Sequence, residues 1–415
     1  MSADVDIVII GGGAAGIGAA RRLAHCGLDV RLLEAGSRLG GRAWTHEIAG
    51  LELDLGCGWL HSAERNSWVA VADAAAIVVD RTRAAWGSQF HDLKFTPEEQ
   101  GAAWHSFDAW TKRLAAYPPA SDCAADSLDP DTEWNSHIRA IVSFISGATL
   151  EHLSAADYVA YDEASSENNW RLRGGYGALI ARSLPREIPV TLATPVTSIT
   201  TDSAGARVGT PAGDIRARAV ILTVSTSVLA GDTIQLPTGF DPWREAARQL
   251  PLGLNEKLFL EVVGTAPFEN ETHVTGNPRD ALTAAYYIRP FGRPVIECFF
   301  GGERARLLCE QGIDTGFAFA IDQLSALFGA DARRHLRPLT GSHWTRMTRI
   351  GGAYSYALPG HVGARQQLAR AYEGRVFVAG EATSAGDFST AHGAHDSGVR
   401  AATEALLALS APAIR

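Results

Sequence analysis

A glycine-rich turn near the start of the chain constrains the fold more than any other feature. The apolar run 6–10 is typical of a buried parallel strand, and glycines follow it in the spacing Gly-x-Gly-x-x-Gly. In a turn from strand to helix, Gly11 permits the tight bend, Gly13 lets the backbone approach a pyrophosphate, and Gly16 lets the helix pack closely on the strand. The turn therefore predicts a dinucleotide-binding unit.

A carboxylate lies where such a unit needs one. The helix expected over 14–26 is closed by Gly27. A second strand over 29–33 then leads into Glu34, which lies 23 positions after Gly11. At this spacing a carboxylate can accept hydrogen bonds from both hydroxyls of an adenosine ribose. Strand, helix and acid together predict a Rossmann-like domain.

The residues just after this acid indicate which dinucleotide binds. Arg38, Gly41 and Arg42 follow Glu34 closely. An arginine here can complement a pyrophosphate that stays bound permanently, whereas nicotinamide enzymes seldom need a second phosphate contact. We therefore predict FAD. The run 34–42 resembles the amino-terminal signature of the flavin-containing amine oxidase family.

The last part of the chain carries a second signature. An apolar strand pattern leads into Gly380 and Glu381, and ligands of open α/β sheets bind at the carboxyl ends of strands. Glu381 could accept hydrogen bonds from the ribityl or pyrophosphate side of the cofactor. Thr390 and Ala391 then open a helix whose backbone N–H groups offer a positive end to the flavin. This segment is similar to the carboxy-terminal signature of the same family, but carotenoid desaturases and protoporphyrinogen oxidases share both signatures.

Three internal residues resemble the amine-oxidising members of the family. Lys257 is one of three lysines and lies in an apolar strand pattern, where burial is costly unless the ammonium is hydrogen-bonded. The resemblance implies that Lys257 holds a water near flavin N5. It also implies that Tyr354, on a presumed strand beyond Trp344, forms one wall of an aromatic cage, and an aromatic face attracts a cation. A solvated lysine and a tyrosine that only packs are the alternatives.

The second wall of the cage differs from that of the monoamine oxidases. Thr390 stands where they carry a tyrosine, and a small residue there is similar to polyamine oxidases. Trp59 and His61 resemble the Trp-x-His-Gly element of animal polyamine oxidases, although Ser62 replaces the glycine. His61 either orients the amine or is an ordinary loop histidine. Because Ala353 occupies the position of the flavin-linking cysteine of vertebrate monoamine oxidases, the resemblance implies non-covalent FAD.

Composition narrows the class of protein. With 415 residues, of which 46% are hydrophobic and 20% charged, the chain is expected to be globular with two domains. A net charge of −9 without a basic run gives no footprint for nucleic acid. The five cysteines are scattered, so neither a metal site nor a disulfide framework is expected. We find no leader pattern and no membrane-length apolar run, and expect a cytoplasmic monomer or homodimer.

The expected architecture is α/β with two discontinuous domains. Helical patterns dominate the first long insertion, with a break at Pro97, and strand-like alternation dominates the second. We expect a Rossmann-like FAD-binding domain over 1–67, 174–250 and 370–415, and an α+β substrate domain over 68–173 and 251–369.

The resemblance implies that a small amine is oxidised to an imine by hydride transfer to flavin N5. Hydrolysis then gives an aldehyde, and O₂ reoxidises the flavin to yield H₂O₂. Polyamines or secondary amines are favoured, followed by other primary amines. A desaturase or isomerase of carbon skeletons and a redox-silent FAD-binding module stay open. The candidate residues are Lys257 and Tyr354 for catalysis; His61, Trp59, Thr390 and Trp344 for the substrate pocket; and Gly11, Gly13, Ala15, Gly16, Glu34, Ala35, Arg38, Gly41, Arg42, Gly58, Trp59, Val196, Gly380, Glu381, Thr390 and Ala391 for the cofactor.

Overall fold

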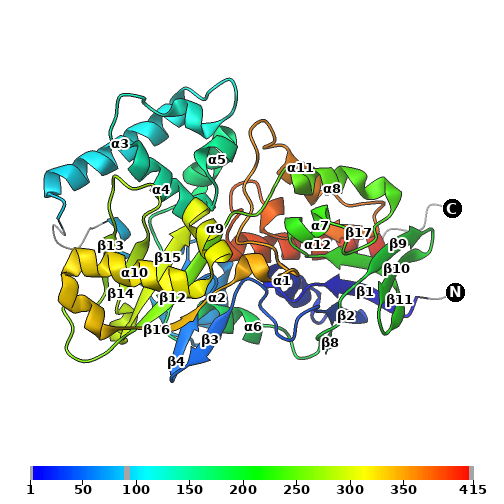
Figure 1. Ribbon diagram of the computed structural model, residues 1–415. Helices are drawn as coiled ribbons and strands as arrows, with labels where there is room; N and C mark the ends of the chain where they lie inside the picture. The colour runs from blue at the N-terminus through cyan, green and yellow to red at the C-terminus, as the bar shows by residue number, and fades with distance from the viewer. Residues whose placement is uncertain (1–2, 88–93, 411–415) are drawn as a thin grey trace.

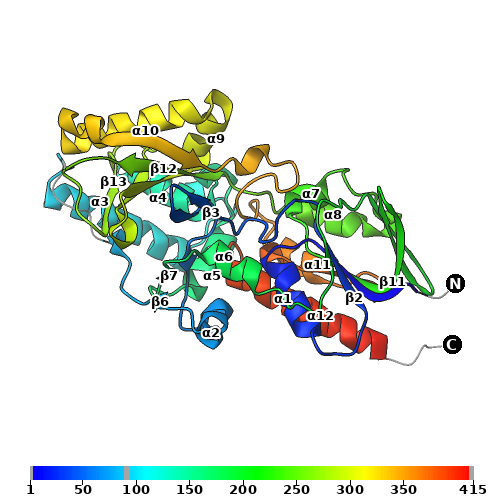
Figure 2. The same cartoon turned by 90° about the horizontal axis from the view of Figure 1, so that it is seen from below.

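The chain folds into two lobes that lie side by side (Figures 1 and 2). The computed structural model describes residues 3–87 and 94–410, so the predicted domain ends at residues 1 and 415 lie outside it. One lobe contains the first strand, β1 (Val5–Ile10), and the last helix, α12 (Ala391–Ser410). The other contains the long helix α3 (Pro97–Ala116) and the strand β12 (Asn255–Val262).

The first lobe is built on a seven-stranded sheet of order β8-β2-β1-β11-β10-β9, with β17 also paired to β11. Strands β8, β2, β1, β11 and β17 are parallel, and β9 to β11 form antiparallel hairpins. This is the Rossmann-like arrangement that the glycine turn predicts. Its other strands are β2 (Val30–Leu33), β8 (Val190–Thr191), β9 (Ser198–Asp202), β10 (Gly205–Thr210), β11 (Gly213–Leu222) and β17 (Val376–Val378).

Helices cover both faces of this sheet, which explains why β1 is apolar on both sides. Side chains of β1 pack alternately into two hydrophobic clusters, one with Ile7 and Ile9 and the other with Val8 and Ile10. The first cluster includes α1 (Ala14–Leu23), α2 (Ser67–Ala74), α6 (Tyr176–Arg182) and α12, and the second α7 (Thr226–Ala230), α8 (Asp241–Arg248) and α11 (Ala364–Ala369).

Helices α1 and α12 cross at very close range (Figure 2). A Cβ added at Gly18 would lie 2.4 Å from the carbonyl oxygen of His395. One added at Gly398 would lie 2.0 Å from the carbonyl oxygen of Ala15. These glycines therefore let the last helix press its backbone against the first, which holds the segments that begin and complete the sheet together.

The second lobe contains a five-stranded sheet of order β13-β14-β15-β12-β16. Along β12, Leu258 and Leu260 face a core shared with α9 (Gly302–Gln311) and α10 (Ile313–Phe328). The alternate residues, Lys257 and Phe259, face the opposite side, because side chains alternate along a strand. The remaining strands are β13 (Thr272–Thr275), β14 (Ala285–Ile288), β15 (Val295–Gly301) and β16 (Leu336–Gly341).

Helices form the rest of this lobe. Pro97, where we expected a break, is the first residue of α3. Thr96 accepts a hydrogen bond from the backbone of Glu99 and Glu99 accepts one from the backbone of Thr96, so a capping box starts the helix. The other helices are α4 (Asn135–Ser146) and α5 (Ala155–Ala164), and short sheets are formed by β3 (Thr45–Ile48) with β4 (Leu51–Asp54) and by β5 (Trp59–Leu60), β6 (Val79–Asp80) and β7 (Trp170–Leu172).

Two local expectations are wrong. Helix α1 ends at Leu23, three residues before Cys26. The presumed strand of Tyr354 is irregular backbone with an isolated bridge at Ser355. Tyr354 lines the cavity described below, whereas Tyr356, two positions later, packs on the core of the helical region. The boundaries of the two predicted domains stay a prediction.

Candidate cofactor-binding and active site

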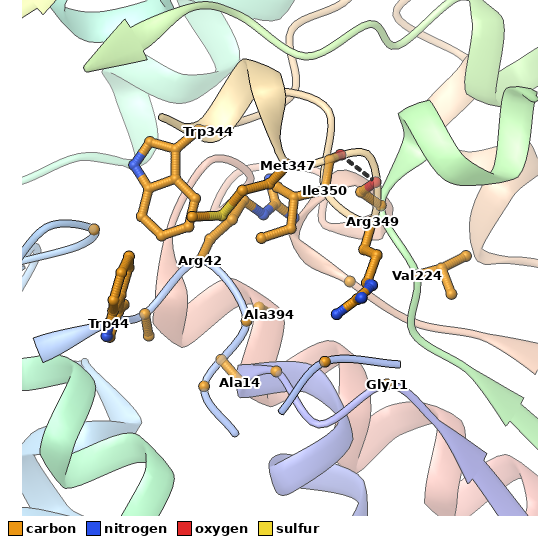
Figure 3. Close-up of a pocket in the computed structure, with 18 of the residues that line it drawn as sticks. Gly11, Ala14, Arg42, Trp44, Val224, Trp344, Met347, Arg349, Ile350 and Ala394 are labelled. Carbon is orange, nitrogen blue, oxygen red and sulfur yellow. Dashed lines mark hydrogen bonds between the residues drawn. The ribbon is translucent and has the colours of Figure 1, made fainter. Parts of the chain in front are cut away.

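A cavity of about 770 Å³ runs between the two lobes. Figure 3 shows Gly11 and Ala14 on its floor, Trp44 and Trp344 at one end, and Arg42 and Arg349 directed into it. Of the predicted site residues, Gly11, Gly13, Ala15, Glu34, Ala35, Arg38, Gly41, Arg42, Gly58, Trp59, Val196, Lys257, Trp344, Tyr354, Gly380, Glu381, Thr390 and Ala391 line it, while Gly16 and His61 do not.

The glycine turn has the geometry expected of a dinucleotide cradle. Gly11 has φ +106°, and a Cβ there would lie 2.4 Å from Oγ1 of Thr223. Gly16 lies behind the turn, where a Cβ would be 1.9 Å from the carbonyl oxygen of Gly11. Around Gly13, the nearest atoms to an added Cβ are 3.9 Å away, so the backbone at the start of α1 is open to a ligand. The positive end of α1 faces this space, which suits a pyrophosphate.

Glu34 is held firmly at the adenosine end of the cavity. One carboxylate oxygen accepts a hydrogen bond of 2.7 Å from the backbone of Gly12, and the other accepts one of 2.6 Å from the backbone of Gly36. Since each carboxylate oxygen can accept two hydrogen bonds, acceptor capacity remains for the hydroxyls of a ribose.

The two predicted arginines have different surroundings. Arg42 donates from Nη1 to the carbonyl of Ala353 at 2.6 Å and to Oε1 of Glu381 at 2.8 Å. Arg38 instead donates to backbone carbonyls of its own loop, including that of Gly41 at 2.7 Å, and its guanidinium stacks on Trp44. Arg38 therefore shapes the loop, and Arg42 is the arginine that bridges separate segments of the cavity wall.

Glu381 is buried and fully engaged by protein donors. Besides Arg42, it accepts hydrogen bonds from the hydroxyl of Ser355 at 2.6 Å and from the backbone of Ser389 at 2.9 Å. Burial alone would raise the pKa of the Glu381 carboxyl, but Arg42 and Ser355 lower it below its ordinary value. Protein donors thus take the oxygens that we expected the cofactor to use, and we infer that Glu381 positions Arg42.

Arg349 is a lining residue that sequence reasoning missed. Its guanidinium is directed into the cavity above the glycine turn (Figure 3). A Cβ added at Gly36 would lie 3.7 Å from Nη1 of Arg349, which places this cation beside the loop of Glu34. The hydroxyl of Ser225 donates to the carbonyl of Ile350 at 2.7 Å and holds the segment in place. The sequence around Arg349 matches no signature, so only the three-dimensional arrangement reveals it.

Lys257 and two aromatic residues form the other end of the cavity. Lys257 is 7% exposed, and its Nζ lies 2.7 Å from Oε1 of Glu297 and donates to the carbonyl of Asp54 at 3.3 Å. Trp344 donates from its indole to the carbonyl of Leu55 and meets Trp44 edge to face, with ring centroids 6.2 Å apart. The ammonium is therefore buried with a partner.

Tyr354 and Thr390 are both fixed by backbone groups. The hydroxyl of Tyr354 donates to the carbonyl of Phe144 at 2.7 Å, close to the carboxyl end of α4. Burial raises the pKa of the Tyr354 phenol well above its ordinary value, so the hydroxyl stays protonated. Thr390 donates to the carbonyl of Asp387 and accepts from the backbone of Gly393, so its hydroxyl stabilises the start of α12.

His61 does not line the cavity, and its role in the substrate pocket stays a prediction. Its Nδ1 lies 2.7 Å from Oδ1 of Asn169, and its ring lies beside Trp86, which in turn contacts Trp59. Burial lowers the pKa of His61 to about 4, so the ring is neutral near pH 7.

The described residues fit FAD. An open glycine cradle faces the start of α1, Glu34 has acceptor capacity for a ribose, and Arg42 and Arg349 supply positive charge to the cavity. Aromatic rings and Lys257 enclose the far end. Among the described residues no group of three or more histidine, cysteine or acidic side chains could hold a metal ion. In the same part of the chain, no helix is both long and apolar enough to span a membrane.

The fold and the cavity define a Rossmann-type flavoprotein. A family model described as flavin containing amine oxidoreductase matches residues 63–406, and one described as an NAD(P)-binding Rossmann-like domain matches residues 9–74. The chain belongs to the family of flavin containing amine oxidoreductases. It is accordingly a flavin-dependent amine oxidoreductase, and its cofactor is FAD.

Curated relatives match either almost the whole chain or part of it, and the solved structures match almost the whole chain. Polyamine oxidase 2 of Arabidopsis thaliana is 24% identical over 96% of this chain and 87% of its own length. Pseudooxynicotine dehydrogenase of a Pseudomonas species is 27% identical over 62% of this chain and 59% of its own length. Putrescine oxidase bound to putrescine has a TM-score of 0.77 at 20% identity, covering 97% and 99% of the two chains. Cyclohexylamine oxidase from Brevibacterium oxydans has a TM-score of 0.75 at 19% identity, covering 98% and 100%.

Proposed function

We propose that this enzyme oxidises a small amine to an imine, which water hydrolyses to an aldehyde and an amine or ammonia, with O₂ as the final electron acceptor and H₂O₂ as the second product. FAD supplies the redox chemistry by accepting a hydride from the carbon next to the amine nitrogen. The observation that carries the proposal is that Lys257 and Tyr354 line the same cavity as the glycine turn.

Lys257 is proposed to hold a water at the reacting end of the cavity. An ammonium has three N–H donors, and Glu297 and the carbonyl of Asp54 account for two of them. The third donor can serve a water in the cavity that Lys257 lines. Because Glu297 and the carbonyl of Asp54 hold Lys257 in place, a water bound to Lys257 would also have a defined position. Catalysis benefits from such preorganised polar groups.

Tyr354, Trp59 and Phe299 are proposed to surround the amine. All three line the cavity near Lys257. Their faces exclude water from the reacting carbon–nitrogen bond and attract a cationic amine before it loses its proton. Because the hydroxyl of Tyr354 is bound to Phe144, the ring presents its face in one orientation.

A secondary amine or a polyamine is the first candidate substrate, supported by Thr390 and by the polyamine oxidases among the relatives. A primary monoamine with an apolar body is the second candidate. Among the described lining residues the carboxylates are Glu34 and Glu381, both bonded to protein donors at the dinucleotide end. At the end of the cavity where the amine is proposed to react, the second ammonium of a diamine would therefore have no carboxylate partner among these lining residues, which favours a monoamine.

A panel of amines tests the proposal. Putrescine, spermidine, N-methylbenzylamine, benzylamine and cyclohexylamine are added anaerobically to the yellow protein, and peroxide is measured separately in air. We expect at least one amine to bleach the flavin absorbance and to produce H₂O₂ stoichiometric with aldehyde. Flavin that no amine bleaches but that a polyene or porphyrinogen reduces would establish the desaturase alternative instead.

A further inference from the structure

We propose that Glu297 is a positioning residue for Lys257, and that this ion pair sets the charge at the reacting end of the cavity. The carboxylate orients the ammonium and cancels its charge, so that a cationic amine can approach and the bound flavin is not made too easy to reduce. The inference rests on the proposed function, because the proposed function makes the end of the cavity where Lys257 lies the end at which the amine reacts.

The strand register places the two side chains together. In the antiparallel pair β12–β15, Lys257 lies opposite Phe299 and Phe259 lies opposite Glu297. Lys257 and Glu297 are therefore diagonal neighbours on one face of the sheet, a separation that long side chains can span. Their Nζ and Oε1 atoms are 2.7 Å apart, and the two side chains are 9% and 20% exposed.

The two side chains of the ion pair lie differently with respect to the cavity. Lys257 and Phe299 line the cavity, whereas Glu297 does not. The carboxylate thus holds the lysine from behind, and the ammonium is the part that faces a bound molecule. A charged hydrogen bond of this length in a buried setting is among the stronger side-chain interactions, so the lysine has little freedom to reorient.

The other groups around the ammonium do not replace Glu297. The backbone carbonyl of Asp54 accepts from Nζ, but its carboxylate is bound by the hydroxyl of Thr45 and the backbone of Tyr176. Burial raises the pKa of the Asp54 carboxyl, and the hydrogen bonds to that group together with the charge of Lys257 act in the opposite direction. Glu297 is therefore the carboxylate in direct contact with the ammonium.

Removing one partner leaves a charge that the cavity wall cannot screen well. An unpaired ammonium would repel a cationic amine and would favour the more electron-rich, reduced state of a neighbouring flavin. An unpaired carboxylate would do the opposite. The two single variants should consequently shift the reduction potential of the bound flavin in opposite directions, which loss of packing alone would not produce.

The test uses the FAD-loaded protein and the variants Glu297→Gln, Lys257→Met and their combination. Glu261→Gln is the matched control, because Glu261 lies further along the same face of β12. FAD occupancy is measured by absorbance, and the potential is measured by anaerobic dithionite titration against a reference dye. We expect full occupancy, a more positive potential for Glu297→Gln, a more negative one for Lys257→Met, and a value near that of the parent for the double variant and the control.

Amine kinetics provide the second readout. Glu297→Gln should lower kcat/KM for the best amine at least tenfold, and adding Glu297→Gln to Lys257→Met should change kcat/KM less than twofold, because the interaction is already lost. An unchanged potential in Glu297→Gln, or additive effects of the two substitutions on kcat/KM in the double variant, would overturn the proposal. If Glu297→Gln loses FAD, Glu297→Asp is measured instead, because it keeps the negative charge. A reduction potential near that of the parent would then support the proposal, and a large shift in potential would overturn it.

The two proposals can fail separately. The dye titration requires no amine, so opposite shifts in potential together with no turnover of any amine would support the ion pair and refute amine oxidation. Amine turnover without any shift in potential would support amine oxidation and refute the role of Glu297.

Discussion

Arg42 joins three separate parts of the cavity wall through one guanidinium. Its bonds to Ala353 and Glu381 are both made by Nη1, and Arg42 lines the cavity. Replacing Arg42 by Met should remove a charge-assisted contact worth about 1.5–3 kcal/mol and leave Glu381 buried without its cation. We expect the purified variant to contain less FAD, measured as the ratio of flavin to protein absorbance, while the exposed Arg370→Met keeps the parental ratio. Parental occupancy in both would show that Arg42 does not hold the cofactor.

Arg349 should contribute to cofactor affinity as well. Its guanidinium lies beside the Glu34 loop and over the glycine turn (Figure 3). For Arg349→Ala we expect FAD to bind the apoprotein roughly tenfold more weakly, which corresponds to the loss of one charge-assisted contact. Titration of apoprotein with FAD, followed by flavin fluorescence, measures this directly. An unchanged dissociation constant would mean that Arg349 only shields the cavity.

The contrast between these residues explains how far the sequence could predict the site. Gly11, Gly13 and Glu34 are recognisable because their roles depend on local spacing within one strand–turn–helix unit. Arg349 and Glu297 act through partners far away in the chain, and their importance depends on sheet register and on how a loop is held. His61 shows the same dependence: its ring is held by Asn169, more than a hundred positions later, which local spacing could not predict.

The crossing of α1 and α12 depends on the absence of a side chain. A Cβ at Gly398 would lie 2.0 Å from the carbonyl oxygen of Ala15, so Gly398→Ala must separate the helices or distort them. We expect a loss of stability of at least about 1–3 kcal/mol, as for other overpacked cores. In α3, Gly101 has no atom within 4 Å of an added Cβ, so Gly101→Ala should stabilise by up to about 1 kcal/mol. Thermal and urea unfolding of the two variants should therefore move in opposite directions.

Helix α4 carries a buried histidine that makes stability depend on pH. Neither ring nitrogen of His137 has a hydrogen-bond partner among the described residues, and burial lowers its pKa from 6.5 to about 4. The folded state therefore prefers the neutral ring, and its stabilising contribution is complete above pH 6.5 and is lost as the pH falls towards 4. The loss approaches about 3 kcal/mol, since one pKa unit corresponds to about 1.4 kcal/mol.

His137→Leu removes this titration and keeps the volume similar. Urea unfolding between pH 7 and pH 4.5 should show a shallower decline for the variant than for the parent, with His25→Leu, at an exposed site, as control. Identical slopes in parent and variant would show that His137 is not the group being protonated.

The element pattern was predictable where the periodicity was strong, as for β1 and β12. The alternation of Lys257, Phe259 and the leucines between them describes β12 correctly: the leucines face one core, whereas on the other face Lys257 lines the cavity and Phe259 packs in a second cluster with Leu55 and Trp344. The segment around Tyr354 reads as a strand by composition but is irregular. Gly351 has φ +84°, and backbone contacts with Gly253 hold the segment instead of a sheet ladder.

The protein as a unit should release its flavin when it unfolds. Ala353 offers no atom that can bond to the cofactor. The thiol of Cys57 also lines the cavity, but burial raises its pKa to about 12, so it is not a nucleophile near pH 7. We expect acid or heat precipitation to leave all flavin in the supernatant with the chromatographic properties of FAD. Yellow colour that stays with the precipitate would contradict non-covalent binding.

The sheet order also determines when during synthesis the cofactor can be captured. A ribosome makes β1 and the glycine turn early, but β17, Glu381 and α12 follow every other strand and helix described here. Until they emerge, the nascent chain has a cradle without the residues that hold Arg42, and the close-packing face of α1 is exposed to water. We therefore expect FAD loading to be a late event that coincides with completion of the fold, and a stalled ribosome to present an apolar helix face to chaperones.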